Sequence, residues 1–227
     1  MNIFVYENYE KMSRAAARFL TARLMENPRG HIGLTAGKTP LGLFQELIRL
    51  YEEGQHVFAE AWYYNLEEVI GHSTDSPESY CTVLRDLLLN HVGVAPDHMR
   101  MPDGLAEDPA AECRLFDDYL DSLPSGGLDV QVLGLGKDGH IGCNRPGDTL
   151  TAPSHVVSLS RGRTGTALGM GGIMRAKCLM MLANGEDKAQ AVADMCHGAI
   201  STHCPATFLQ LHPNSLVFLD QAAASRL

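Results

Sequence analysis

LDVQVLGLG, residues 128–136, is the most strand-like run of the sequence, and it leads directly into KDGHIGCNRPGDTL, residues 137–150. The first part is apolar and ends in glycines, as expected of a buried strand that opens into a turn. The second part carries four polar side chains of different chemistry, Asp138, His140, Asn144 and Arg145. In an α/β sheet, ligands bind at the carboxyl ends of strands, so this stretch predicts both a buried strand and a site.

Short apolar runs alternate with longer amphipathic runs along the rest of the chain. The runs that predict strands are 2–7, 31–35, 61–66, 128–136, 155–160, 178–184 and 215–220. The runs that predict helices are 10–27, 39–54, 77–93, 109–123 and 186–198. Strands that alternate with helices form βαβ units. We therefore expect one α/β domain over residues 1–227, with a mostly parallel, Rossmann-like sheet flanked by helices.

The composition limits the class of partner. The 227 residues carry a formal net charge of −9, which argues against nucleic acid or an anionic membrane as the main partner. A small anion needs only a few N–H groups and one or two cations, so the net charge does not exclude it. The six cysteines are irregularly spaced and form no C-x-x-C pair. The sequence also has no run of membrane-spanning length and no signal-peptide pattern. We therefore expect a cytoplasmic protein with reduced thiols.

Three polar loops follow predicted strands. They are TAGKTP (35–40), NLEEVIGHSTDSPESY (65–80) and GKDGHIGCNRPGD (136–148). Because the carboxyl ends of parallel strands lie at one edge of a sheet, we expect these loops to converge on one site.

The first loop has the features of an anion-binding turn. Gly37 allows backbone N–H groups to approach a ligand, Thr39 adds a hydroxyl, and the following helix start favours negative charge. Lys188 also lies at a predicted helix start, where a bound anion would offset the unfavourable helix dipole. The alternatives are an ordinary capped turn and a lysine that points into solvent.

The other two loops carry proton-transfer groups. Glu67 or Glu68 is a candidate general base if burial raises its pKa, and a solvated loop with a capping acid is the alternative. Asp138, two residues before His140, is placed to orient the imidazole and select its tautomer, although a histidine that only bonds its loop also fits. No pattern of His or Cys spacing accompanies them, so we expect no metal.

Five segments, in chain order, resemble the glucosamine-6-phosphate deaminase and galactosamine-6-phosphate isomerase family. GLGKDGHIGCNRPGDTL (134–150) is similar to its signature, in which a glycine-rich turn carries Asp-Gly-His and then Asn-Glu-Pro-Gly. GLTAGKTPLGLFQEL (33–47) resembles its phosphate-binding turn, and YNLEEVIGHSTDSPESY (64–80) resembles its Asp-Glu loop. CLMMLANGEDKAQAV (178–192) and CPATFLQLHPNSLVFLDQAAA (204–224) are similar to its C-terminal portion.

The resemblance implies an aldose–ketose isomerisation coupled to deamination. An amino sugar 6-phosphate, with a glucosamine or galactosamine skeleton, would become a ketose 6-phosphate and ammonia without a cofactor. Carried over by position, His140 opens the sugar ring with Asp138 as its partner, and Glu67 removes the C2 proton. The implied substrate-binding residues are Gly37, Lys38, Thr39, Glu68, Asn144 and Lys188. The expected partner is a small sugar phosphate, with no nucleic acid and no membrane, and a homo-oligomer is compatible with the sequence.

Three features depart from the family pattern. Glu67 replaces a shorter acid, and a misplacement of about 1 Å can cost about 100-fold in rate. Arg145, which we include among the candidate catalytic residues, stands where the family has a glutamate. The stretch from Leu150 to Ala167 is shorter than the family's lid, and its only cations are Arg161 and Arg163.

Arg145 leaves three interpretations open: it recruits a further negative group, it marks loss of the parent activity, or it points into solvent. Two other functions also remain, a 6-phosphogluconolactonase-like hydrolase and a sugar-phosphate-binding protein with altered catalysis. The Asn-x-Pro-Gly continuation after the histidine favours the deaminase form.

Overall fold

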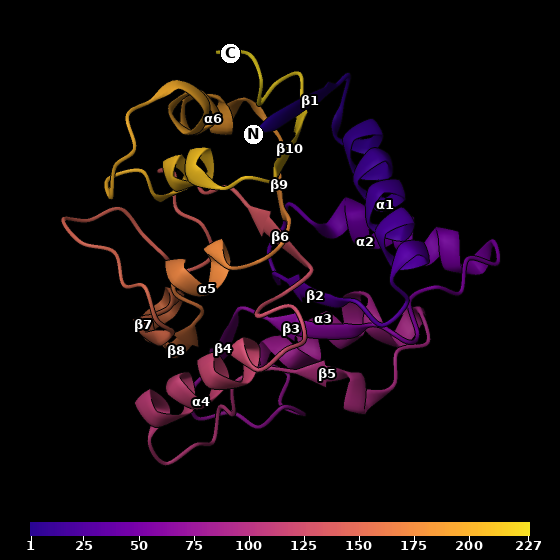
Figure 1. The fold of residues 1–227 in the computed structure, drawn as a ribbon, viewed down its shortest axis with the longest axis vertical. Coiled ribbons are helices and arrows are strands. Elements are labelled where there is room, and N and C mark those ends of the chain that lie inside the picture. The colour runs from indigo at the N-terminus through magenta and orange to yellow at the C-terminus, as the bar shows by residue number, and fades with distance from the viewer.

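A seven-stranded sheet forms the centre of the protein in the computed structural model, which describes all of residues 1–227 (Figure 1). The strand order is β1-β10-β9-β6-β2-β3-β5, and every neighbouring pair is parallel. The strands are β1 (Asn2–Tyr6), β2 (His31–Leu34), β3 (Trp62–Asn65), β5 (Met99–Arg100), β6 (Val130–Gly134), β9 (Leu179–Ala183) and β10 (Ser215–Asp220). The predicted α/β fold with a mostly parallel sheet is therefore confirmed.

Helices cover both faces of this sheet (Figure 1). On one face lie α1 (Tyr9–Glu26), α2 (Leu41–Glu52) and α3 (Tyr80–Leu87). On the other lie α4 (Pro109–Asp121), α5 (Met170–Met174), α6 (Ala189–His197) and a 3₁₀ segment at Pro205–Leu211. None of these helices is both long enough and apolar enough to cross a membrane.

The central strands are apolar on both sides because each side faces a helical layer. In β9, Met180 and Leu182 pack under α1 and α2, whereas Leu179 and Met181 pack towards α5 and α6. Consecutive side chains of a strand point to opposite faces, so a strand buried on both faces reads as a continuous apolar run. This explains why the period-two pattern is missing from CLMMLAN.

A second, smaller sheet lies beside the first and was not predicted. It has three antiparallel strands in the order β4-β8-β7, with β4 at Glu67–Val69, β7 at His155–Ser158 and β8 at Thr164–Ala167. Asp117 on α4 connects the small sheet to that helix. The Asp117 carboxylate accepts hydrogen bonds from the amide of Ser154 at 2.8 Å and from its hydroxyl at 2.6 Å, and Ser154 directly precedes β7. The small sheet positions Glu67 at the carboxyl ends of the strands of the large sheet.

Candidate active site

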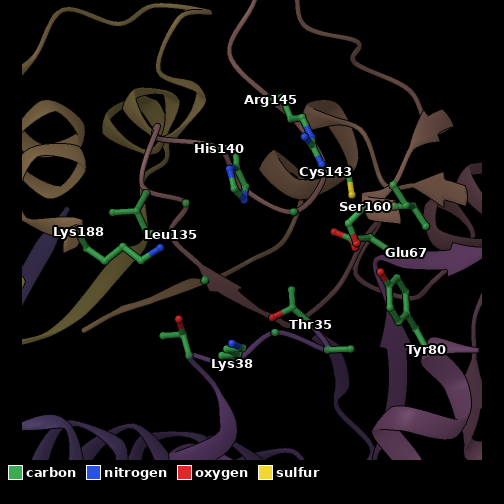
Figure 2. Close-up of a pocket in the computed structure, with 17 residues that line it drawn as sticks. Thr35, Lys38, Glu67, Tyr80, Leu135, His140, Cys143, Arg145, Ser160 and Lys188 are labelled. Carbon is green, nitrogen blue, oxygen red and sulfur yellow. The ribbon is translucent and has the colours of Figure 1, made fainter. Parts of the chain in front are cut away.

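A pocket lined mostly by polar residues and glycines lies at the carboxyl ends of β2, β3, β6 and β9. These four strands are neighbours in the sheet, so the loops after them meet, as expected for this class of fold. The pocket has a volume of about 370 Å³. Predicted site residues that line it are Gly37, Lys38, Thr39, Glu67, His140, Arg145 and Lys188 (Figure 2).

One end of the pocket presents free backbone amides and a helix start. The backbone N–H groups of Gly37, Lys38 and Thr39 donate to no acceptor within the protein, and α2 begins directly after them. α2 has no side-chain cap, so its N-terminal dipole also faces this turn. Free amides, a helix start and a cation form the usual environment of a bound phosphate.

Lys188 reaches the same pocket from the loop after β9 (Figure 2). Its pKa is lowered by burial and by the nearby charge of Lys137, although Asp187 and Asp138 act in the opposite direction. The Asp187 carboxylate pairs with Lys137 at 2.8 Å and makes no ion pair with Lys188. The Lys188 ammonium is thus left without a direct carboxylate partner, and an anion in the pocket would supply one.

The predicted pairing of Asp138 with His140 is confirmed. The Nδ1 atom of His140 lies 2.6 Å from Oδ1 of Asp138, and the same oxygen accepts from the His140 amide at 3.2 Å. Burial alone would raise the pKa of Asp138, but the bonds and charge from His140 outweigh it and lower that pKa. Because an ionised carboxylate only accepts hydrogen bonds, Nδ1 carries the hydrogen, which leaves Nε2 free to take a proton.

Two glycines make room for this arrangement. A Cβ added at Gly136 would overlap with the imidazole ring of His140. Gly139 has a φ of 83°, which lets the chain turn between Asp138 and His140. The glycine-rich sequence of this turn is therefore required by the position of the histidine ring.

Glu67 and Glu68 point in opposite directions because they are consecutive residues of β4. Glu67 lines the pocket, whereas Glu68 is only 1% exposed and faces the start of α3. The Glu68 carboxylate accepts bonds from Val69 N, Ser79 Oγ, Tyr80 N and Cys81 N, at 2.7 to 3.1 Å. The expected contact between Glu68 and substrate does not fit this geometry, since its oxygens are occupied in capping a helix.

The Glu67 carboxylate has the environment of a general base. Burial raises its pKa, while the Cys143 thiol, His140 and Arg145 partly lower it. The hydroxyl of Tyr80 points towards it across the pocket (Figure 2), and burial together with the Glu67 charge raises the pKa of that phenol. A carboxylate that burial makes more basic, and that still faces open space, is able to take a proton from a ligand.

Arg145 lines the pocket on the side of Glu67 and Cys143, although much of its side chain is exposed (Figure 2). Asn144, directly before it, turns inward and is 3% exposed. The Asn144 amide group donates to Ile141 O at 3.2 Å and to Leu168 O at 2.9 Å. Asn144 therefore holds the loop in place and does not line the pocket, contrary to the expected substrate contact.

Sequence reasoning missed several residues that line the pocket. They are Thr35, Tyr80, Cys143, Leu159 and Ser160, among others. Tyr80 and Cys143 stood inside loops already considered important, so their positions could have been anticipated. Leu159 and Ser160 follow β7, and only the small sheet brings them here. Arg161 and Arg163, the cations expected in a lid, do not line the pocket.

The site holds no cluster of three or more His, Cys, Asp or Glu side chains that could bind a metal ion. The groups that face the pocket are the Glu67 carboxylate, an oriented imidazole, cationic side chains and free amides.

Comparisons with known proteins show the family of the chain. A family model described as glucosamine-6-phosphate isomerases/6-phosphogluconolactonase matches residues 7–218. The glucosamine-6-phosphate deaminase of Clostridium perfringens (strain 13 / Type A) is 37% identical over 243 aligned residues, covering 100% of both chains. That of Thermoanaerobacter pseudethanolicus is 35% identical, covering 99% of this chain and 94% of the relative.

Solved structures show the same fold. A monomeric glucosamine-6-phosphate deaminase superposes with a TM-score of 0.93 and 34% identity, covering 100% of both chains. A 6-phosphogluconolactonase from Trypanosoma brucei has a TM-score of 0.81 but only 22% identity, covering 100% of this chain and 98% of that one, and shares the fold alone. With a family model over almost the whole sequence and full-length relatives above 30% identity, the chain belongs to the glucosamine-6-phosphate isomerase/6-phosphogluconolactonase family.

Proposed function

We propose that this protein converts an amino sugar 6-phosphate to the ketose 6-phosphate and ammonia. One observation carries the proposal: the Glu67 carboxylate and the His140 imidazole face a single pocket whose other end offers free amides and Lys188. A carboxylate base and an imidazole suit proton transfers at neighbouring atoms of a sugar, and the amides and lysine suit its phosphate.

The reaction begins with ring opening at His140. Its Nε2 takes the proton of the anomeric hydroxyl and passes a proton to the ring oxygen, which yields the open-chain aldehyde. Asp138 holds the imidazole in the tautomer that this transfer needs and stabilises its charged form. The pairing resembles the way in which an aspartate orients a catalytic histidine in other enzymes.

Glu67 then removes the proton at C2, and an enolamine forms between C1 and C2. Return of the proton to C1 produces an imine at C2. Water hydrolyses the imine, which releases ammonia and leaves the ketose. Throughout these steps Lys188 and the amides of Gly37, Lys38 and Thr39 hold the phosphate, so the reacting carbons stay beside Glu67.

The deaminase reaction is favoured over lactone hydrolysis by two facts. Relatives named glucosamine-6-phosphate deaminase reach 37% identity over their full length, whereas the lactonase structures reach 22%. The residue that distinguishes the reactions is Glu67, because abstraction of a carbon-bound proton needs a strong, partly desolvated base. We place the reaction in the cytoplasm, which fits six cysteines that are all unpaired.

The test is an assay of the purified protein for ammonia and ketose together. The substrates are glucosamine 6-phosphate, galactosamine 6-phosphate, free glucosamine and 6-phosphogluconolactone. We expect ammonia and ketose in equal amounts from at least one amino sugar phosphate and none from free glucosamine. Hydrolysis of the lactone without any ammonia release would instead identify a lactonase, and binding without turnover would identify a sugar-phosphate-binding protein.

Lys188→Ala separates recognition of the phosphate from chemistry. Loss of a charged hydrogen bond weakens binding by about 10- to 100-fold. KM for the phosphorylated sugar should rise by such a factor, while Lys177→Ala, which removes a lysine paired with Asp129 away from this pocket, should change it much less. Equal binding of free and phosphorylated sugar by the wild type would contradict the phosphate assignment.

A further inference from the structure

The guanidinium of Arg145 is a cation without a partner at the reacting end of the pocket. No carboxylate forms an ion pair with it: Asp138 pairs with His140, and Glu67 feels the charge of Arg145 only from beyond ion-pair distance. Its backbone is held in place, because Nδ2 of the preceding Asn144 donates to both Ile141 O and Leu168 O. The backbone of Arg145 is therefore fixed, while its guanidinium is free to bind a ligand.

The position of Arg145 in the pocket places it beside the C1 end of the sugar. Figure 2 shows Lys188 and Arg145 on different sides of His140, with Glu67 on the side of Arg145. A sugar whose phosphate lies at Lys188 and whose C2 lies at Glu67 therefore presents its C1 end to Arg145. This placement rests on the proposed function.

The reaction generates negative charge at that end. When Glu67 takes the C2 proton, the electrons of the C–H bond form a double bond between C1 and C2. The electron pair of the C1 carbonyl moves onto O1, which becomes an oxyanion until it takes a proton from solvent. Glu67 cannot stabilise this charge, and Cys143, whose pKa is raised by burial and by Glu67, is a weak donor.

We propose that Arg145 is a catalytic residue that donates hydrogen bonds to O1 and stabilises the oxyanion formed as the C2 proton leaves. Groups aimed at developing charge accelerate the chemical step because they bind the transition state better than the substrate. The same site should prefer a ligand that carries a permanent negative charge at C1. An amino sugar acid 6-phosphate, with a carboxylate at C1, is the chemical class that fits.

The test combines kinetics and binding on three variants. Arg145→Gln removes the charge, Arg145→Lys keeps it, and Arg18→Gln is the matched control, since Arg18 is exposed on α1, makes no ion pair and does not line the pocket. Activity is ammonia release from glucosamine 6-phosphate, measured at the pH where kcat no longer changes. We expect Arg145→Gln to lower kcat by at least about tenfold with little change in KM, Arg145→Lys to restore part of it, and Arg18→Gln to match the wild type.

Binding is measured by calorimetry with two probes that differ only at C1. They are 2-amino-2-deoxygluconate 6-phosphate, which carries a carboxylate there, and 2-amino-2-deoxyglucitol 6-phosphate, which carries a hydroxymethyl group. The wild type and Arg18→Gln should bind the carboxylate at least about tenfold more tightly, and Arg145→Gln should lose this preference.

Four results would overturn the proposal: unchanged kcat in Arg145→Gln, a change confined to KM, a carboxylate preference that survives in Arg145→Gln, or no carboxylate preference in the wild type. The proposed function fails separately, if the wild type releases no ammonia from any amino sugar phosphate. Ammonia release by a wild type that does not distinguish the two probes would leave the function standing and refute the role of Arg145.

Discussion

Nδ1 of His140 lies 2.6 Å from Oδ1 of Asp138, so the carboxylate selects the tautomer of the imidazole and directs Nε2 to the ligand. Asp138→Asn keeps the size of the side chain but removes the charge that stabilises the imidazolium. We expect kcat for ammonia release to fall about 100-fold, at the lower end of the range for general acid–base catalysis. KM should change little, because Asp138 does not line the pocket. Asp148→Asn, on an exposed side chain, is the control, and similar activity in the two variants would refute the role of Asp138.

The substitution Gly136→Ala tests the hydrogen bond between His140 and Asp138 by changing how the His140 ring packs. Gly136→Ala places a methyl group where the His140 ring now lies, so the ring must move away from Asp138. We expect a loss of at least about 100-fold in kcat with the circular dichroism spectrum of a folded protein. Gly147→Ala is the matched substitution in the same loop, and its added Cβ meets nothing closer than 3.6 Å. Full activity in Gly136→Ala would show that the observed ring position is not needed.

The pH dependence of kcat/KM should report the ionisation of Glu67. Burial raises the pKa of this carboxyl, and Arg145 partly opposes the shift. The base is active when ionised, so activity should be lost as the pH falls through the raised pKa. Removal of the positive charge in Arg145→Gln raises that pKa further, and the acid limb should move to higher pH. An acid limb that stays in place, or moves to lower pH, would contradict the assignment of Glu67.

The neighbouring acid should affect stability. Glu68 is buried and accepts four hydrogen bonds at the start of α3. In Glu68→Gln an NH₂ group replaces one acceptor oxygen and faces donors, which should lower the free energy of unfolding by about 1–3 kcal/mol. Glu67→Gln should leave that free energy near the wild-type value, because burial already disfavours its charge. Urea unfolding of both variants measures the difference. A larger loss of stability in Glu67→Gln than in Glu68→Gln would contradict the assignment of Glu67 as the base and Glu68 as the helix-capping residue.

The large sheet could be predicted because its central strands are long apolar runs. The runs LDVQVLGLG and CLMMLAN correspond to β6 and β9, which are buried on both faces. The meeting of the three polar loops could also be predicted, since it follows from the common direction of parallel strands. These features depend on local sequence and on one general rule of α/β folds.

The small sheet could not be predicted in the same way. β4 has three residues and β8 has four, TGTA, so neither shows a usable hydrophobic period. Their pairing joins Glu67 to Ala167, one hundred positions apart in the chain. Consequently the sequence did not distinguish Glu68 from a substrate contact, and it did not reveal that Leu159 and Ser160 reach the pocket. The place of Asn144 outside the pocket lining could not be predicted for a related reason, because its sequence position does not show that its amide bonds to Ile141 and Leu168.

The most direct test of the central claim follows the reaction of glucosamine 6-phosphate in D₂O by proton NMR, with galactosamine 6-phosphate in parallel. If Glu67 is the C2 base in an isomerisation that releases ammonia, the wild type should lose the C2 proton signal and form ketose 6-phosphate in step with ammonia. In Glu67→Gln the C2 proton should persist, with its loss slowed by at least about 100-fold. Ketose and ammonia formed by Glu67→Gln at the wild-type rate, or an unchanged C2 signal in the wild type with both sugars, would contradict the account.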